Sequence, residues 1–168
     1  MIALLDAAYG DDRAAAGCVM AQSWDAANAA SEHTVVQSTA ASYQPGQFYK
    51  RELPLLLAVI PVGLPITFAV VDGYTSLGPD LTPALGAHLF EALSGRFPVI
   101  GVAKTAFVGT PAEEVLRGRS ERPLYVTSIG VNAKVAAQCV RQMHGDNRIP
   151  SLIKRADQLA RLALGDDR

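Results

Sequence analysis

Three acidic residues stand where the surrounding sequence is apolar or where an apolar element begins or ends. Asp6 lies inside the run 2–9, Asp72 closes an apolar run just before Gly73, and Glu52 lies near the start of a predicted helix. A carboxylate in a core strand is costly to bury unless it is paired, protonated or bound to a cation. Carboxylates without cysteine or histidine partners are hard oxygen ligands that suit Mg²⁺ or Mn²⁺ better than zinc. The sequence therefore offers a candidate metal site, although an aspartate before a glycine is also a common turn pair.

The elements that must position these acids follow from apolar periodicity and turn residues. We expect strands over 2–9, 14–24, 34–39, 68–71, 98–103 and 124–127, and helices over 47–60, 84–93, 131–143 and 151–164. The polar stretch 110–122 predicts a loop with a helical turn. An antiparallel meander followed by alternating strands and helices predicts an α/β fold, a mixed sheet with helices on both faces. Such sheets bind ligands at the carboxyl ends of their strands.

One long apolar segment, 53–71, requires a membrane test because only Thr67 interrupts its apolar character. Its length approaches that of a spanning helix. Three prolines and a glycine break it, namely Pro54, Pro61, Gly63 and Pro65. These residues predict a helix up to residue 60, a turn, and a buried strand over 66–71, with no membrane partner. The absence of a leader pattern, with two distant cysteines, predicts a cytoplasmic protein.

The composition predicts one globular domain over 1–168, because 49% of the residues are hydrophobic and 18% are charged. The net charge of -1 conceals an asymmetry. Residues 1–94 hold three basic and nine acidic side chains, whereas residues 95–164 hold eleven basic and five acidic ones. A fold that brings both parts around one cleft would combine an acidic floor with a phosphate-binding rim. Solvated surface charge is the alternative interpretation.

Short blocks follow one another along nearly the whole chain. They are Tyr-Gln-Pro-Gly at 43–46, Tyr-Lys-Arg-Glu-Leu-Pro at 49–54, Val-Val-Asp-Gly at 70–73, Gly-Ala-His-Leu at 86–89, Pro-Val-Ile-Gly-Val-Ala-Lys at 98–104, Pro-Leu-Tyr-Val-Thr-Ser-Ile-Gly at 123–130, and Pro150 with Arg-Ala-Asp at 155–157. In this order the blocks resemble endonuclease V, the deoxyinosine-directed repair nuclease family. The resemblance implies an RNase H-like fold, which agrees with the expected order of strands and helices.

The resemblance also implies roles for the candidate residues. Asp6, Glu52 and Asp72 would be catalytic carboxylates that bind Mg²⁺ or Mn²⁺, and Lys104 would lie near the scissile phosphate. Divalent ions held in this way neutralise the phosphodiester and orient a water. The implied activity is hydrolysis of a phosphodiester near a deaminated purine, in DNA or RNA that contains inosine.

Further residues would bind nucleic acid. Tyr43 and Pro45, with Gly46 in the same turn, resemble the wedge that separates strands and helps to turn the lesion base into a pocket. A turn with a packed tyrosine is the plainer interpretation. Gly73 would lie beside that pocket, where a missing side chain allows close approach. Arg155, in the basic later part of the chain, would contact phosphate. The sequence indicates no oligomeric state.

Two positions depart from the family pattern. Val131 stands where family members usually carry a histidine close to the metal site, and Gly78 stands where they carry a second one. Val131 predicts a slower nuclease, because valine neither ligates a metal nor moves a proton. His88 is retained, and a helical histidine packed on a sheet is more often structural. These departures leave open a second hypothesis, a nucleic-acid-binding relative with little or no catalysis.

Overall fold

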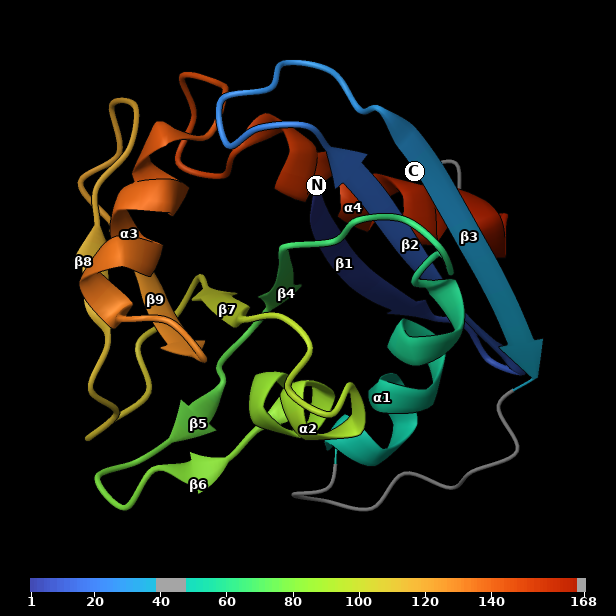
Figure 1. Ribbon diagram of the computed structural model, residues 1–168, viewed down its shortest axis with the longest axis horizontal. Helices are drawn as coiled ribbons and strands as arrows, with labels where there is room; N and C mark the ends of the chain where they lie inside the picture. Colours follow the sequence, from blue (N-terminus) through green and yellow to red (C-terminus); the bar gives the residue numbers. More distant parts are fainter. Residues whose placement is uncertain (39–47, 166–168) are drawn as a thin grey trace.

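The computed structural model describes residues 1–38 and 48–165, and a seven-stranded sheet lies at its centre (Figure 1). Its strands are β1 (Ile2–Tyr9), β2 (Arg13–Ala21), β3 (Ser31–Ser38), β4 (Phe68–Asp72), β7 (Val99–Ala103), β8 (Glu113–Val115) and β9 (Leu124–Ile129). They lie side by side in the order β3-β2-β1-β4-β7-β9-β8. A separate hairpin of β5 (Ser76–Leu77) and β6 (Thr82–Pro83) follows β4.

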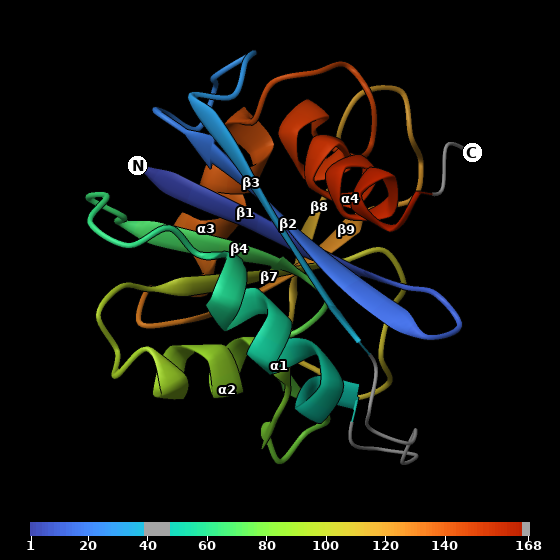
Figure 2. The same ribbon diagram turned by 90° about the vertical axis from the view of Figure 1, so that its right-hand side faces the viewer.

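Helices cover both faces of this sheet (Figure 2). In the described part of the chain, α1 (Phe48–Val59) and α2 (Leu85–Ala92) pack on one face, and α3 (Ala133–Gln142) and α4 (Ser151–Leu164) pack on the other. Successive side chains of a strand point to opposite faces. Leu4 accordingly joins the core beneath α3 and α4, whereas Leu5 joins the core beneath α1 and α2. The predicted mixed sheet with helices on both faces is confirmed.

The directions of the central strands decide which strand ends meet. β1, β4 and β7 run parallel, with Leu5 opposite Val71 and Asp72 opposite Val102. Their carboxyl ends therefore share one edge of the sheet, called here the carboxyl edge. β9 runs antiparallel to β7, so that it begins at the carboxyl edge and ends at the opposite one.

The structure corrects one predicted element and shifts others. The stretch 110–122 contains strand β8, which pairs with β9, and not the predicted helical turn. A three-residue strand with only Val115 fully buried is too short to show an alternating pattern. Helix α3 begins at Ala133 and not at 131, because Asn132 caps it by accepting a hydrogen bond from the Lys134 N–H at 2.9 Å.

The apolar segment 53–71 follows its predicted course. Helix α1 continues to Val59, a turn with Gly63 at φ +84° follows, and strand β4 begins at Phe68. Among residues 1–38 and 48–165, no helix is both long enough and apolar enough to cross a membrane.

A glycine in β2 allows α4 to approach the sheet beside the acids. Gly17 pairs with Asp6 across β1 and β2, and a Cβ at this glycine would lie 2.7 Å from the Ala156 carbonyl oxygen. That distance is shorter than any ordinary contact, so the helix lies against bare backbone here. The residue after Ala156, Asp157, is thereby brought to the same place on the sheet as Asp6.

Gly17→Ala is expected to lower the free energy of unfolding by about 1–3 kcal/mol, because the added methyl group forces α4 away from the sheet. Gly10→Ala is the matched control: its Cβ would meet only the Arg13 carbonyl oxygen, at an ordinary 3.5 Å. Urea unfolding of both variants measures the difference. Equal stabilities would show that α4 accommodates the methyl group without strain.

Candidate active site

Two carboxylates, the buried Asp6 and the partly exposed Asp72, lie at the carboxyl edge on neighbouring parallel strands. Asp6 and Asp72 each follow the paired residues Leu5 and Val71, and they extend toward the face that carries α4. Asp6 is only 8% exposed, and its Oδ1 accepts a hydrogen bond of 2.8 Å from the Ala7 N–H. Burial, with the negative charge of Asp72 as the next cause, raises the pKa of Asp6 to about 7.

Glu52 reaches the same edge from helix α1 on the other face. Burial raises the pKa of Glu52 to about 8, and the negative charges of Asp6 and Asp72 add to this effect. The structure thus brings together all three acids that the sequence singled out, from two strands and one helix. Each disfavours the charge of the others, so the group is poised to accept a cation or a proton.

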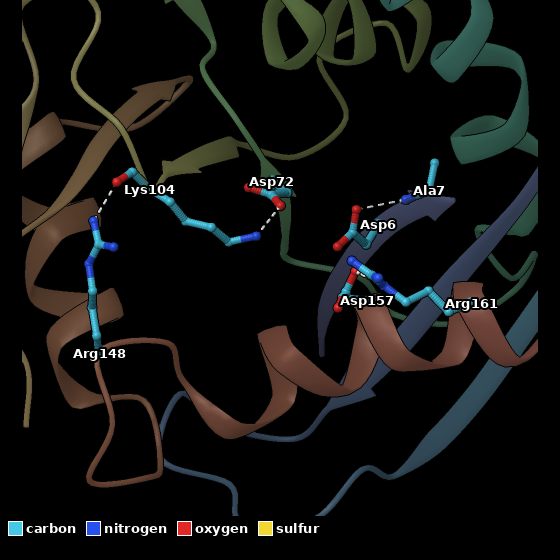
Figure 3. Close-up of polar contacts among 7 residues, drawn as sticks. All are labelled: Asp6, Ala7, Asp72, Lys104, Arg148, Asp157 and Arg161. Carbon is cyan, nitrogen blue, oxygen red and sulfur yellow. Dashed lines mark hydrogen bonds and ion pairs between the residues drawn. The ribbon is translucent and has the colours of Figure 1, made fainter. Parts of the chain in front are cut away.

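Lys104 supplies a positive charge to this group. It follows β7, and its Nζ lies 2.5 Å from Asp72 Oδ2. Figure 3 shows the Lys104 side chain extended toward Asp72. Burial by itself lowers the pKa of Lys104, but the hydrogen bond and charge of Asp72, together with Asp6 and Asp157, raise it overall. Sequence position alone placed Lys104 only at the end of a strand.

Asp157 is a fourth acid at this place, and it was not among the predicted site residues. It projects from α4 toward Asp6, and its charge contributes to the raised pKa of Asp6 (Figure 3). Asp157 also accepts a hydrogen bond of 2.9 Å from Arg161 Nε, one helical turn later. Its place in the block 155–157 was the available signal, but a helical pattern does not tell which strand a polar side chain will meet.

The donor set is made of carboxylate oxygens, which is the chemistry of a Mg²⁺ or Mn²⁺ site. Among the residues that the structure describes, no three acidic, histidine or cysteine side chains are arranged as the ligands of one metal ion. Lys104 instead provides the positive charge at Asp72. The acids fit a hard cation by the type of their oxygen ligands and by their mutual repulsion.

The raised pKa values predict how the stability of the metal-free protein depends on pH. The folded chain keeps protons on Asp6 and Glu52 up to pH about 7 to 8, whereas the unfolded chain loses them near the ordinary values of 3.8 and 4.5. The free energy of unfolding should therefore fall as pH rises from about 4 to 8, by up to roughly 3 kcal/mol per pH unit where both groups contribute. Urea unfolding in EDTA across this range measures the slope. The slope should flatten in a protein that carries both Asp6→Asn and Glu52→Gln, and an equal slope in that variant would contradict the assignment.

A cavity of about 580 Å³ opens beside the acids. Glu52, Asp72 and Gly73 line it together with Tyr49 and His88. The rings of Tyr49 and His88 stack with their centroids 3.7 Å apart and an interplanar angle of 15°. Gly73 has φ +121°, and apart from its chain neighbours no atom of residues 1–38 and 48–165 lies within 4 Å of where its Cβ would stand. A flat ring could therefore enter between an aromatic wall and an open glycine, next to the carboxylates.

Hydrogen bonds between loops fix the geometry after β4 and β7. The Tyr74 hydroxyl donates to the Thr105 carbonyl oxygen at 2.8 Å and accepts from the Phe107 N–H at 3.1 Å. The buried Thr75 donates its N–H to Thr127 Oγ1 at 2.9 Å. The Tyr74 bonds tie the chain that follows Asp72 to the chain that follows Lys104, and the Thr75 bond ties it to β9.

The structure does not place Val131 at the acids. Because β9 runs antiparallel, Val126 lies level with Asp72, whereas the end of β9 at Ile129 pairs with Val99 at the opposite edge. Three strand residues separate these levels by about 10 Å, and Val131 lies beyond them. Val131 instead packs against the core beneath α3 and α4. The expected position beside the metal site is therefore wrong for this residue, and with it the reason for a slower nuclease.

Gly78 occupies a turn that does not favour a side chain. Its φ is +71°, and its N–H donates to Thr110 Oγ1 at 2.7 Å. An L-residue here would be strained, so glycine at this position serves the backbone.

Arg155 is not brought to the acids either. Its Nε and Nη2 donate to the two carboxylate oxygens of Glu32 on β3, each at 2.7 Å. β3 is an edge strand, separated from β1 by β2. The role of Arg155 in nucleic-acid binding stays a prediction. Tyr43, Pro45 and Gly46 lie outside the described residues.

Comparisons with known proteins agree on one family. A sequence profile described as endonuclease V matches residues 1–130. No curated protein matches the chain. The crystal structure of endonuclease V from Streptomyces avermitilis is 30% identical in sequence, with a TM-score of 0.76 over 98% of this chain and 81% of that chain.

Two further structures share the fold at lower identity. Human endonuclease V is 22% identical, with a TM-score of 0.77 over 98% of this chain and 84% of that chain. Ciona intestinalis endonuclease V, in complex with a 24mer DNA containing an inosine followed by a ribo-adenosine, is 18% identical, with a TM-score of 0.74 over 99% of this chain and 86% of that chain. The fold is therefore RNase H-like, and by its profile match and its 30% identical relative this chain belongs to the endonuclease V family.

Proposed function

We propose that this protein is a metal-dependent endonuclease that hydrolyses a phosphodiester near a deaminated purine, inosine, in nucleic acid. The observation that carries the proposal is the group of Asp6, Glu52, Asp72 and Lys104 at the carboxyl edge, next to a cavity of about 580 Å³. Buried like charges without sufficient neutralisation destabilise a fold, so their presence at one edge points to a function. Membership of the family and the inosine-containing complex of the Ciona relative support the choice of substrate.

The cofactor in this proposal is Mg²⁺ or Mn²⁺, held by Asp6, Glu52 and Asp72. When bound, such a cation would supply charge neutralisation for the phosphodiester and an activated water. The carboxylates of this chain hold and orient the cation, and its charge relieves their mutual repulsion. Asp157 adds negative charge beside Asp6 and strengthens the attraction for a divalent ion.

The remaining residues divide substrate binding between phosphate and base. The Lys104 ammonium lies at the acids and is positioned to contact the scissile phosphate. The cavity accepts the unstacked base, with the Tyr49 and His88 rings on one side and the open Gly73 on another. Because Asp72 lines the same cavity, a base bound there brings its own backbone to the acids. Tyr43 and Pro45, which lie outside the described residues, are proposed to separate the strands, so that the base reaches the cavity.

Incubation of the purified protein with end-labelled oligonucleotides tests the function. One set is DNA and one is RNA, each with a single inosine or with adenosine at the same position, in Mg²⁺, Mn²⁺ or EDTA. We expect cleavage of an inosine strand in Mg²⁺ or Mn²⁺, and none in EDTA or with adenosine. A folded protein that retains the strands without cutting them would be a nucleic-acid-binding relative, and the nuclease proposal would be rejected.

A further inference from the structure

Three loops meet beside Lys104, and one guanidinium joins them. Arg148 lies in the loop between α3 and α4, and its Nη2 donates to the main-chain carbonyl oxygen of Lys104 (Figure 3). The same Nη2 donates to the Pro123 carbonyl oxygen at 2.7 Å. Lys104 directly follows β7 and Pro123 directly precedes β9. A single side chain therefore links both of these strand ends to the α3–α4 loop at the carboxyl edge.

The guanidinium of Arg148 is held in this pose at a cost. Its Nε is buried and has no hydrogen-bond partner among the described residues. A buried N–H without a partner loses its hydration and gains nothing in exchange. The side chain thus gives up one hydrogen bond while it keeps both carbonyl contacts, which shows that those contacts dominate its orientation.

A second arginine shapes the loop that carries Arg148. Arg117 is 6% exposed and donates to the carbonyl oxygens of Gly145 and Asn147, both at 3.0 Å. The next residue, Gly118, has φ +58°, and a Cβ there would lie 1.9 Å from the Asp146 carbonyl oxygen. The loop before β9 and the α3–α4 loop are therefore packed backbone against backbone, and Arg148 is presented to Lys104 from a fixed support.

We propose that Arg148 is a positioning residue for the candidate active site, which acts through the main chain of Lys104 to hold its ammonium against Asp72. Both of these contacts are to main-chain carbonyl oxygens of the protein, so Arg148 acts here through the backbone. The Lys104 side chain is 44% exposed and has one ion pair, with Asp72. Without a fixed main chain, such a long and exposed side chain would leave this partner readily. The contacts of Arg148 with the carbonyl oxygens of Lys104 and Pro123 are called here the Arg148 brace. The catalytic consequence rests on the proposed nuclease function, whereas the Arg148 brace does not.

Amide hydrogen exchange of the metal-free protein tests the Arg148 brace without any need for activity. The Phe107 N–H reports on this loop because it is hydrogen-bonded to the Tyr74 hydroxyl. Arg148→Gln should speed exchange in peptides over 103–108 by about tenfold, and leave β1 and β2 unchanged. Arg119→Gln, an exposed arginine of the neighbouring loop, is the matched control and should change nothing. Unchanged exchange at 103–108 in folded Arg148→Gln would overturn the proposal. If that variant does not fold, the same measurement on Arg148→Lys decides.

A double-mutant cycle then tests the action through Lys104. Arg148→Gln should lower kcat on an inosine-containing oligonucleotide by about 10- to 100-fold, because a displaced catalytic group loses its alignment, with KM little changed. In a Lys104→Met background the same change should have no further effect. If the losses of kcat in the double variant equal the product of the two single losses, Arg148 acts independently of Lys104 and the proposal is overturned. A raised KM with a weaker salt dependence would show a direct contact with nucleic acid and would also overturn it. If the unaltered protein cleaves nothing, the nuclease proposal is rejected, and hydrogen exchange alone decides whether Arg148 holds the main chain of Lys104 in place.

Discussion

Replacing Asp6 by asparagine is expected to abolish cleavage of inosine-containing nucleic acid and, at the same time, to stabilise the metal-free protein at about pH 8. The loss of cleavage should reach about 10³-fold, which corresponds to ~4 kcal/mol of lost transition-state stabilisation. The gain in stability is expected because asparagine carries no charge, whereas the buried Asp6 carboxylate does at this pH. Asp6 is 8% exposed, and burial and its acidic neighbours raise its pKa to about 7, so its ionised form is unfavourable in the fold.

The opposite signs of these two effects separate function from structure. Substitution of a residue that only supports the fold would lower both the activity and the stability of the protein. Substitution of a catalytic residue lowers the activity but can raise the stability, because such a residue is often unfavourable for the fold. Asp12→Asn is the matched control, since the Asp12 side chain is 87% exposed in the β1–β2 turn. Oligonucleotide cleavage and urea unfolding in EDTA measure the pair. An Asp6→Asn protein that is both active and less stable would remove Asp6 from the site.

Lys104→Met is expected to lower kcat by about 10²-fold, because a preorganised cation beside the phosphate is lost. It should also destabilise the metal-free protein above about pH 7, where Asp6 is ionised and the ammonium that lies 2.5 Å from Asp72 is missing. Single-turnover cleavage and thermal unfolding at two pH values measure these effects. The loss of kcat should exceed the change in KM, because Lys104 lies at the acids and not on a surface that would contact the nucleic-acid backbone farther away.

The control for this prediction is Lys134→Met, which removes an equal charge from the exposed first turn of α3. It should leave both kcat and pH-dependent stability as they are. Lys104→Arg should recover part of the activity, because the charge returns on a longer and planar group. Equal effects of the changes at 104 and 134 would mean that only net charge matters, and the placement of Lys104 at the acids would then have no catalytic importance.

The residue types along the chain determined much of what the structure shows. Acids inside or at the end of apolar runs, as at Asp6 and Asp72, were recognisable as candidate site residues. Burial of a carboxylate costs free energy unless the group is paired, protonated or bound to a cation. Sheets of this class bind ligands at the carboxyl ends of their strands, which made both acids candidates for one site. The structure shows that β1 and β4 are parallel neighbours, which brings Asp6 and Asp72 together. The order of helix, turn and strand over 53–71 could also be predicted, because proline and glycine act on the local backbone.

Tertiary structure alone decided the features that depend on direction and on which face of an element meets a neighbour. The pattern of β9 is the same whether the strand runs up or down, and its antiparallel direction places Val131 at the edge opposite the acids. A helical stripe shows which side of α4 is buried but not which strand it meets, so the meeting of Asp157 with Asp6 followed only from the close approach at Gly17. Local sequence sets backbone preferences and burial within each element, whereas strand direction and helix placement are set by contacts between residues far apart in the chain.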